Sequence, residues 1–351
     1  MKVSLNDYSE LLASGYNLDR NQISQVAGLL IDNGVDEDSK CAFLKRFSAK
    51  GETDEEFAGF VSEFRKLAKN PQLDDYADRA IDLCGTGGDR SGSFNISTFV
   101  SLVVAAAGVP VIKHGNRSIS SKCGSADLLE ALGIPMETDP EKLNASLSEL
   151  NFCFLFAPYF HPAFKCLAPI RKKMAEEGII TMFNRLGPCL NPATPAHQIL
   201  GVYDPVYLEQ MAHSLASNGS KSGWIVHGIV DEKTSQRMDE LTACGPNHIR
   251  PYGTGKDSKI TLEPNHWGIG RYPKKDLNGG TLQQNLSILR GLLNGDAPAG
   301  LRATIIINVS SALWIAGNVG SIEAGILWAE ELLCDGSVSR WLNKAREHFA
   351  K

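Results

Sequence analysis

The sequence lacks long apolar runs, an excess of positive charge and a leader-like start. Its longest apolar stretches, such as Phe99–Ile112, are shorter than the roughly 20 residues of a membrane-spanning helix. The formal net charge is −5, which leaves no general basic footprint for nucleic acid. Residues Met1–Arg20 mix charged and apolar side chains and contain no signal-peptide core. We therefore expect a soluble protein without a membrane or nucleic-acid partner.

The eight cysteines also lack a pattern. None forms a C-x-x-C pair, and no histidine stands at the spacing of a zinc ligand. Scattered cysteines are typical of reduced thiols in cytosolic proteins, where disulfides are rare. The sequence thus predicts a cytoplasmic protein with neither a disulfide framework nor a zinc site.

With 351 residues, of which 43% are hydrophobic and 21% charged, the chain is long enough for two packed domains. Apolar residues recur at helical spacing through residues 1–70. In this region Thr53 and Glu56 form a capping-box pattern ahead of an apolar face. Pro71 opens a polar stretch, which we interpret as the boundary between a helical domain, residues 1–70, and a second domain, residues 75–351.

From residue 80 onward, short apolar runs alternate with helical patterns. Strands are predicted at Ile81–Leu83, Val109–Ile112, Asn151–Phe156 and Trp224–His227. Helices are predicted at Thr98–Ala107, Ser125–Leu132, Pro140–Leu150 and Tyr207–Ser217. This alternation favours an α/β fold with helices on both faces of a sheet. Residues 304–316 stay ambiguous, because Thr304–Ile307 has the composition of a strand and its continuation looks helical.

A glycine-rich loop follows the first predicted strand. Residues 82–89 read Asp-Leu-Cys-Gly-Thr-Gly-Gly-Asp, and glycines there let the backbone turn sharply and bring N–H groups close to an anion. The loop matches neither the dinucleotide fingerprint nor the P-loop. An ordinary turn between a strand and a helix is the alternative.

Two further segments are suited to phosphate. Ser93–Thr98 precedes an apolar helix whose N-terminal amides attract anions, although Ser97 and Thr98 are equally typical of helix caps. Lys113–Ser125 follows the second predicted strand and collects cationic side chains and hydroxyls. Because loops after parallel strands meet at the carboxyl edge of the sheet, we expect the three loops to share one site. We interpret His114 as a positioning group rather than a base.

Adjacent carboxylates occur at Asp231-Glu232 and at Asp239-Glu240. A diphosphate normally binds together with Mg²⁺, which one or two carboxylates hold. Spacing alone does not choose between the two pairs, and either pair is also typical of an acidic surface.

Taken together, these motifs resemble the anthranilate phosphoribosyltransferase family. The similarity extends over nearly the whole chain, through KGET (Lys50–Thr53), GTGGD (Gly85–Asp89), NIST (Asn95–Thr98), KHGNRSISSKCGSADLLEALG (Lys113–Gly133), FLFAP (Phe154–Pro158), PIR (Pro169–Arg171), FNRLGPCLNPA (Phe183–Ala193) and DELTACGP (Asp239–Pro246). The sequence departs from the family pattern at Ile180, where an arginine is usual, and at Arg185 and Cys189, all beside the expected acceptor pocket.

The resemblance implies a small all-helical domain, formed by residues 1–70 and helices from the 160–195 region, that makes a homodimer. This domain would pack on a larger α/β domain with a mixed, mostly parallel central sheet. The resemblance also implies that residues 304–316 form a helix.

The implied substrates are 5-phosphoribosyl pyrophosphate (PRPP) and anthranilate, with Mg²⁺ as the cofactor. PRPP would be held by Gly85, Gly88, Asp89, Ser93, Asn95, Ile96, Ser97, Thr98, Lys113, His114, Gly115, Asn116, Arg117, Ser118, Ile119, Ser120, Ser121 and Ser125. Mg²⁺ would be held by Ser97, Asp239 and Glu240, and anthranilate would face Gly85, Asn116 and Arg171.

The implied reaction needs no dedicated acid or base, because an aromatic amine is largely neutral near pH 7 and attacks directly. Lys113, His114 and Asn116 would only position the reactants. Two competing hypotheses remain: a pyrimidine nucleoside phosphorylase on a related fold, and a non-catalytic relative that binds nucleic acid. The cationic loop and Asp239-Glu240 argue against the first, and the acidic net charge argues against the second.

Overall fold

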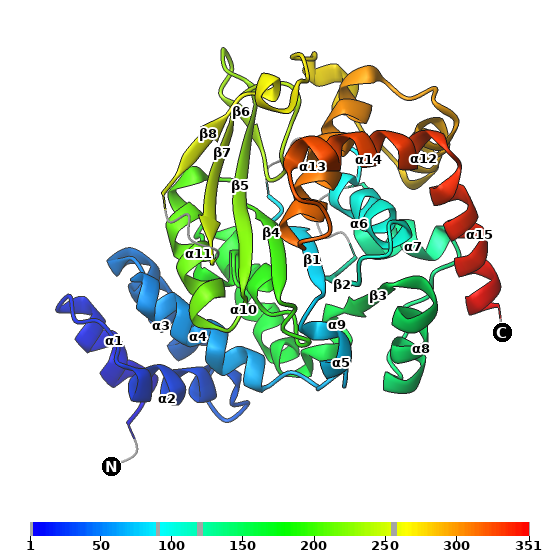
Figure 1. Ribbon diagram of the computed structural model, residues 1–351. Coiled ribbons are helices and arrows are strands. Elements are labelled where there is room, and N and C mark those ends of the chain that lie inside the picture. The colour runs from blue at the N-terminus through cyan, green and yellow to red at the C-terminus, as the bar shows by residue number, and fades with distance from the viewer. Residues whose placement is uncertain (1–2, 89–91, 118–121, 254–257, 351) are drawn as a thin grey trace.

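The computed structural model describes residues 3–88, 92–117, 122–253 and 258–350. In this part of the chain, the N-terminal helices and the C-terminal helices lie on opposite sides of a central sheet (Figure 1). The N-terminal helices are α1 (Leu5–Ala13), α2 (Arg20–Ile31), α3 (Glu37–Lys50) and α4 (Asp54–Lys66), and the short α5 (Asp74–Ala77) leads into the sheet.

The four N-terminal helices each begin at a polar capping residue. The side chains of Ser4, Asp19, Asp36 and Thr53 accept a hydrogen bond from the amide three residues on, which satisfies a donor left unpaired at a helix start. The predicted capping box of Thr53 and Glu56 is confirmed, since each side chain bonds the amide of the other.

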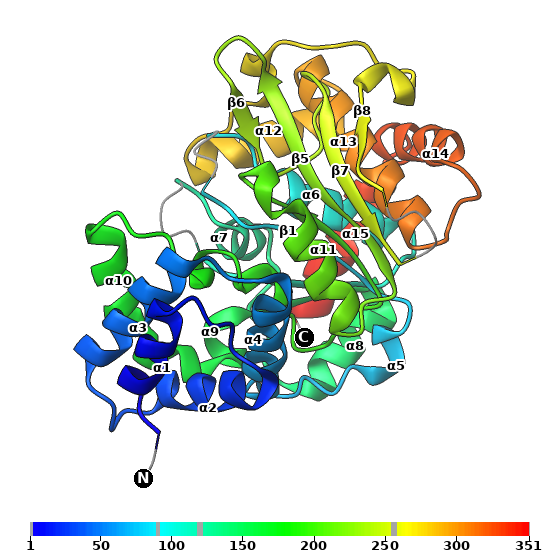
Figure 2. The same cartoon turned by 90° about the vertical axis from the view of Figure 1, so that its left-hand side faces the viewer.

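The N-terminal helices do not bury their apolar faces alone. They share one apolar cluster with α10 (Ala168–Glu176), the segment after it and α11 (Leu208–Ser217). The Phe64 ring of α4 lies 5.6 Å from the Phe183 ring, and Arg65 donates a hydrogen bond to the carbonyl oxygen of Cys189. Figure 2 shows α4 and α11 side by side, as their contacts require.

The described residues form an eight-stranded sheet in the order β3-β2-β1-β4-β5-β7-β8, with β6 paired to β5. The strands are β1 (Ile81–Gly85), β2 (Val111–Gly115), β3 (Phe152–Phe156), β4 (His197–Gly201), β5 (Ser222–Asp231), β6 (Gln236–Met238), β7 (Asn247–Tyr252) and β8 (Ile260–Leu262). The first five pair in parallel, whereas β6, β7 and β8 join in antiparallel orientation. The predicted mixed, mostly parallel sheet is confirmed.

Helices cover both faces of the sheet, as predicted. Side chains alternate along a strand, so Ile199 and Trp224 face one apolar cluster while Leu200 and Ile225 face the other. The first cluster contains most of the remaining helices, and the second contains α11 and the N-terminal helices. The remaining helices are α6 (Ile96–Ala106), α7 (Ser125–Ala131), α8 (Pro140–Leu150), α9 (Ala157–Phe160), α12 (Leu282–Asn294), α13 (Ala299–Ile315), α14 (Ile322–Cys334) and α15 (Ser337–Phe349).

The four predicted strands and four predicted helices are all present. The helix at Pro140–Leu150 has the predicted bounds, and the others differ at one or both ends. The sequence does not predict β4, because its five residues begin with the polar His197 and Gln198. The strand composition of Thr304–Ile307 is misleading, since these residues lie in α13. That helix is buried on nearly all sides, and its β-branched side chains reflect this burial rather than a strand. The helix implied by the resemblance is confirmed.

Within the described part of the chain, no single helix has the length and apolar character needed to cross a membrane. The helices α12 and α13 meet this test only as a pair bent by 77°. Most side chains of α13 are buried inside the protein.

The strand order reverses between β1 and β4, and ligands of open α/β sheets bind beyond the carboxyl ends of the strands at such a point. Residues Asp239 and Glu240 cross this edge, and glycines leave room for them. A Cβ built on Gly85 would lie 2.2 Å from Oδ2 of Asp239, and one on Gly201 would lie 1.6 Å from its carbonyl oxygen. A Cβ built on Gly228 would lie 2.4 Å from the carbonyl oxygen of Glu240.

Replacing Gly201 with alanine tests this close packing. The added methyl group would meet the Asp239 backbone, so we expect Gly201→Ala to lower the free energy of unfolding by about 1–3 kcal/mol. Gly28→Ala is the matched control, because Gly28 is exposed on α2 with no atom within 4 Å of its built Cβ. This control should stabilise the protein by about 0.5–1 kcal/mol. Urea unfolding measures both effects, and equal stabilities would contradict the packing.

Candidate active site

The glycine-rich loop after β1 is turned toward a carboxylate. Gly87 and Gly88 adopt positive φ angles of 68° and 82°, which favour glycine. The loop is fixed at its start, where the Thr86 amide donates a hydrogen bond of 2.9 Å to the carbonyl oxygen of Gly201 in β4. The Gly87 amide then donates a hydrogen bond of 2.7 Å to Oδ2 of Asp239. The loop therefore presents an N–H group to negative charge, as the sequence predicts.

The second segment ends at the N-terminus of α6. This helix begins at Ile96, and its cap residue, Asn95, makes no side-chain capping bond. Ser97 and Thr98 lie inside the first turn, so the alternative interpretation of both as cap residues is wrong. The Ser97 amide donates a hydrogen bond of 3.1 Å to Oε1 of Glu240, which places a carboxylate at the positive end of the helix.

The third segment is linked to the second by hydrogen bonds. The Asn95 side-chain amide donates to the carbonyl oxygen of Cys123 at 3.1 Å. The Ser125 hydroxyl donates to the carbonyl oxygen of Asn116 at 3.0 Å, across the ends of the loop. A Cβ built on Gly115 would lie 2.9 Å from the same hydroxyl oxygen and 2.9 Å from Cε2 of Phe154, so a larger residue would displace these side chains.

Several predicted donor residues can be placed and others cannot. Ser93 forms an isolated bridge with Asn278 beside the second segment. Asp89, Ser118, Ile119, Ser120 and Ser121 lie outside the described residues.

Lys113 and His114 are buried at the end of β2 rather than open to solvent. The Lys113 ammonium donates a hydrogen bond to the carbonyl oxygen of Leu83 in β1. Burial, and then the neighbouring His161, hold the pKa of His114 well below its usual range. His114 is therefore a neutral imidazole, and it does not add to the positive charge of the loop.

A buried carboxyl lies beneath these two side chains. Asp82 accepts hydrogen bonds from the Asn191 side chain at 3.0 Å and from the His114 amide at 3.4 Å. Burial raises the pKa of Asp82 to about 6, although the nearby Lys113 ammonium and the Asn191 hydrogen bond oppose this rise. The group ties β1 and β2 together under the loops.

Arg117 points toward α7. Its guanidinium pairs with Asp127 at 2.9 Å and with Glu130 at 2.6 Å, and the arginine side chain is 46% exposed. In this arrangement its charge is balanced by α7, although the residue stands in the predicted donor loop.

The structure distinguishes the two carboxylate pairs. Asp239 and Glu240 contact the first and second loops, as described above. Glu232 instead forms an exposed ion pair with Arg271 at 2.6 Å, and Asp231 caps a turn at the Lys233 amide. Spacing left this choice open, and the resemblance favoured the pair at 239–240.

The donor set at this edge fits Mg²⁺ by its chemistry. Two carboxylates and the Ser97 hydroxyl are hard oxygen ligands, which Mg²⁺ prefers. All three residues are partly exposed beside the loops. Within the described residues, no cluster of three or more His, Cys, Asp or Glu side chains forms a metal site of its own. A metal at this edge would therefore take part of its ligands from a bound diphosphate or water.

The predicted acceptor residues come from different elements. Gly85 and Asn116 lie at the ends of β1 and β2, which are neighbours in the sheet. Arg171 lies on α10 and is exposed. Burial of part of the guanidinium is the one cause that lowers its pKa, and in the described part of the chain no carboxylate acts on it.

His161 is a further residue beside this site, and the sequence motifs do not predict it. Its ring lies 5.0 Å from the His114 ring in an edge-to-face arrangement, and it is buried. Burial lowers the pKa of His161 to about 4, so it too is neutral. The one signal is its position, three residues after the FLFAP motif that ends at Pro158.

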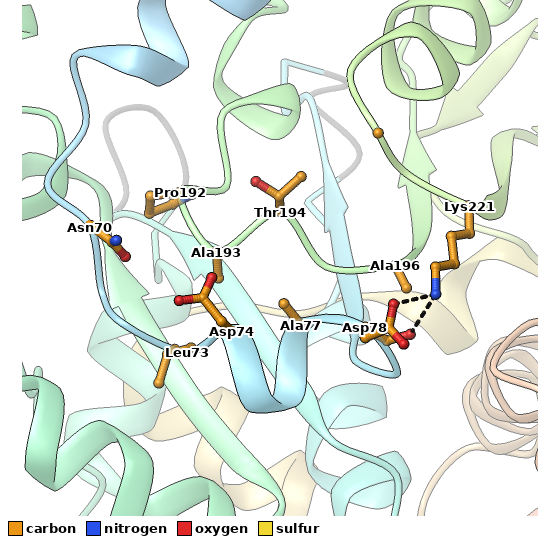
Figure 3. A pocket seen from close by; sticks show the side chains of 11 residues that line it. Asn70, Leu73, Asp74, Ala77, Asp78, Pro192, Ala193, Thr194, Ala196 and Lys221 are labelled. Atoms are coloured by element: carbon orange, nitrogen blue, oxygen red, sulfur yellow. Dashed lines mark hydrogen bonds and ion pairs between the residues drawn. The ribbon is translucent and has the colours of Figure 1, made fainter.

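One pocket of the described residues lies away from this edge. It has a volume of about 370 Å³ and lies at the amino ends of the strands, between Ala77, Thr194 and Ala196 (Figure 3). Lys221 and Asp78 pair across its rim. The phosphate-type loops are at the opposite edge, so this pocket takes no part in the site.

Comparisons with known proteins agree with the geometry. The sequence matches the family described as "Glycosyl transferase family, a/b domain" over residues 77–339. It is 39% identical over 341 residues to the anthranilate phosphoribosyltransferase of Brevibacillus brevis, which covers 97% of this chain and 96% of that protein.

Solved structures give the same result. Anthranilate phosphoribosyltransferase from Thermus thermophilus is similar with a TM-score of 0.87 at 35% identity, over 98% of this chain and 100% of that chain. The Saccharomyces cerevisiae enzyme in complex with PRPP and Mg shares the fold, with a TM-score of 0.80 at 24% identity, over 99% and 98% of the two chains. The chain belongs to the anthranilate phosphoribosyltransferase family.

Proposed function

We propose that the protein transfers the 5-phosphoribosyl group of PRPP to the amine of anthranilate in tryptophan biosynthesis. The products are N-(5-phosphoribosyl)anthranilate and pyrophosphate. The observation that carries this proposal is the meeting of three phosphate-type loops with Asp239 and Glu240 at the edge between β1 and β4. The near-full-length similarity to anthranilate phosphoribosyltransferases supports the same reaction.

PRPP would lie across the three loops. The amides of Gly87 and Ser97 donate to the carboxylates of Asp239 and Glu240, which joins the first two loops, and Asn95 links the second loop to the third. As the bond between ribose C1 and pyrophosphate breaks, negative charge grows on the departing oxygens. Fixed N–H groups aimed at that charge stabilise the transition state without reorganising. The donor residues named from the sequence, including Asp89 and Ser118–Ser121, are proposed as its ligands.

We propose that Ser97, Asp239 and Glu240 hold Mg²⁺. The chemistry that bound Mg²⁺ supplies is neutralisation of charge on the leaving pyrophosphate. The two carboxylates already face the loops that would hold the phosphates. The yeast enzyme, which shares the fold, binds PRPP and Mg, and this supports the same requirement.

Anthranilate would bind through its carboxylate and its ring. Arg171 is suited to the carboxylate, because a guanidinium can donate to both oxygens, and Gly85 and Asn116 would face the ring. The amine is neutral near pH 7 and attacks C1 without a strong base. His114 is neutral and buried, so its proposed role is to position the reactants together with Lys113 and Asn116.

We further propose a cytoplasmic homodimer in which residues 1–70 and helices from 160–195 form a helical domain beside the α/β domain of residues 75–351. Val3, Leu11 and Tyr16 of the helical region are exposed, which supports contact with a second subunit. None of the eight cysteines, all of them among the described residues, is in a disulfide, which supports a reducing compartment.

One assay separates the proposed reaction from its alternatives. Anthranilate is fluorescent, so loss of its fluorescence with PRPP and Mg²⁺ reports turnover. Turnover that requires a pyrimidine nucleoside and inorganic phosphate instead would assign the chain to the phosphorylases. Tight nucleic-acid binding that weakens steeply with salt, without PRPP-dependent turnover, would favour the non-catalytic relative.

Neutral replacement of Asp239 and Glu240 should weaken the use of Mg²⁺. We expect the double variant Asp239→Asn, Glu240→Gln to need about 10- to 100-fold more Mg²⁺ for half-maximal rate, since charge-assisted bonds contribute roughly 1.5–3 kcal/mol. The matched control is Asp231→Asn, Glu232→Gln, because that pair lies away from the loops. Equal Mg²⁺ dependence of both variants and the wild type would remove 239–240 from the metal site.

Replacing Arg171 should affect the acceptor selectively. Arg171→Ala removes the proposed partner of the anthranilate carboxylate, so we expect its KM for anthranilate to rise about 10- to 100-fold on loss of a charged hydrogen bond. The KM for PRPP should stay within about 2-fold, because the residue lies outside the three loops. Lys172→Ala, at the neighbouring exposed position, is the control and should leave both constants unchanged. Equal rises in both KM values for Arg171→Ala would show that the residue is misplaced.

The pH dependence tests whether His114 acts as a base. Burial lowers its pKa well below 6.5, so the imidazole is neutral throughout pH 6–8 in the folded protein. We therefore expect the kcat/KM of His114→Asn to be reduced by a constant factor over this range. Parallel pH–rate profiles of the wild type and the variant would agree with a positioning role. If the kcat/KM of the wild type divided by that of His114→Asn falls as the pH drops through 6.5, His114 titrates and acts as a base.

A further inference from the structure

Arg185 is a buried cation outside the residues proposed to touch substrate. It follows the short 3₁₀ helix Met182–Asn184, and 2% of its surface is exposed. Its Nη2 donates a hydrogen bond of 2.9 Å to Oε2 of Glu52, in the turn between α3 and α4. Burying two charges costs desolvation energy, so stability alone explains this ion pair poorly.

Aromatic rings surround the rest of the guanidinium. The Cζ atom of Arg185 lies 4.1 Å from the centroid of the Tyr207 ring and 5.6 Å from the centroid of the Phe57 ring. These distances fall within the range of attraction between a cation and a ring face. Nε of Arg185 is buried, and in the described part of the chain it has no hydrogen-bond partner. The Glu52 carboxylate and the Tyr207 ring are therefore its main partners.

The contacts of Arg185 continue to the glycine-rich loop. The Tyr207 ring packs edge-to-face on Tyr203, with ring centroids 5.6 Å apart. The Tyr203 amide donates a hydrogen bond of 3.2 Å to Oγ1 of Thr86. A Cβ built on Gly88 would lie 3.9 Å from Cδ1 of Tyr203, so the ring lies directly against the loop.

We propose that Arg185 is a positioning residue for the phosphoribosyl donor. Anchored by Glu52 to the helical region, it holds Tyr207, and through it Tyr203, behind residues Thr86–Gly88. Without Arg185, Tyr207 loses the charge on its face and Tyr203 is free to shift. The backbone of Thr86–Gly88, whose Gly87 amide donates to Asp239, then loses its fixed place at the proposed donor site. The inference rests on the proposed function of this loop and predicts an effect on PRPP rather than on anthranilate, because the contacts end at the loop.

Kinetics of Arg185 variants test this role. We expect Arg185→Leu to raise the KM for PRPP, and its calorimetric Kd with Mg²⁺ present, by about 10-fold, because small displacements of positioning groups are costly. The KM for anthranilate should change by less than about 2-fold. Arg185→Lys keeps a charge for Glu52 but loses the planar group over Tyr207, so its PRPP constants should be intermediate. This variant carries the test if the leucine variant does not fold.

A second buried ion pair in the same region serves as the control. Lys50 and Glu56 lie 2.7 Å apart with side chains 9% and 1% exposed. The other hydrogen bonds of these two side chains among the described residues run to Asn17, Leu18 and Thr53 of the helical region. Glu56→Gln should lower the thermal midpoint while leaving the KM for PRPP unchanged. An equal rise in this KM for Glu56→Gln and Arg185→Leu would reduce Arg185 to a structural role and overturn the proposal.

The link through Tyr203 predicts coupling. If Arg185 acts through this ring, the double variant Arg185→Leu, Tyr203→Leu should raise the KM for PRPP no more than the larger single effect. If the two single-variant increases in the KM for PRPP multiply in the double variant, Arg185 does not act through Tyr203, and the proposal is overturned. Failure of the proposed phosphoribosyl transfer can be told apart from failure of the Arg185 inference. A wild-type protein that is inactive with PRPP and anthranilate refutes the proposed transfer. An active wild type with an unchanged PRPP KM in Arg185→Leu refutes only this inference.

Discussion

The site depends on one constraint, which is that Asp239 and Glu240 lie directly against the ends of β1, β4 and β5. Their backbone occupies space that a side chain on Gly201 or Gly228 would fill. Their carboxylates accept hydrogen bonds from the amides of Gly87 and Ser97 and so join the glycine-rich loop to the start of α6. The edge of the sheet where the strand order reverses supplies the place, and the glycines make it available.

The groups around this edge are arranged for charge and position rather than for proton transfer. His114 and His161 are neutral because burial disfavours their charged forms. Lys113 is held against the backbone of β1, close to the buried Asp82, and so helps to fix β2 beside β1. These features suit a reaction in which a neutral amine displaces a good leaving group. Such a reaction gains most from alignment of the reactants and from fixed donors that meet the departing charge.

The sequence predicts the parts of the site that are local and misses those that are not. Glycines after a strand reveal the 85–88 segment, because the positive φ angles of Gly87 and Gly88 favour glycine. The 95–98 segment is revealed by its hydroxyls beside an apolar helix, although Ser97 and Thr98 lie in the first turn and are not caps. The pairing of Glu240 with Ser97 joins residues 143 positions apart, and no spacing rule contains it. The sequence does not predict the central strand β4, because its first residues are polar. In the sequence, Arg185 is only an unusual residue within a family motif. The proposal that it positions the glycine-rich loop depends on its contacts with Glu52 and Tyr207 and on the packing of Tyr207 against Tyr203.

Arg117 stands in the cationic loop, yet its charge is already matched within the protein. Its guanidinium is matched by Asp127 and Glu130 on α7, in exposed ion pairs that add little to the stability of the fold. An anion that pairs with Arg117 would therefore have to replace two carboxylates of α7 that already neutralise the guanidinium.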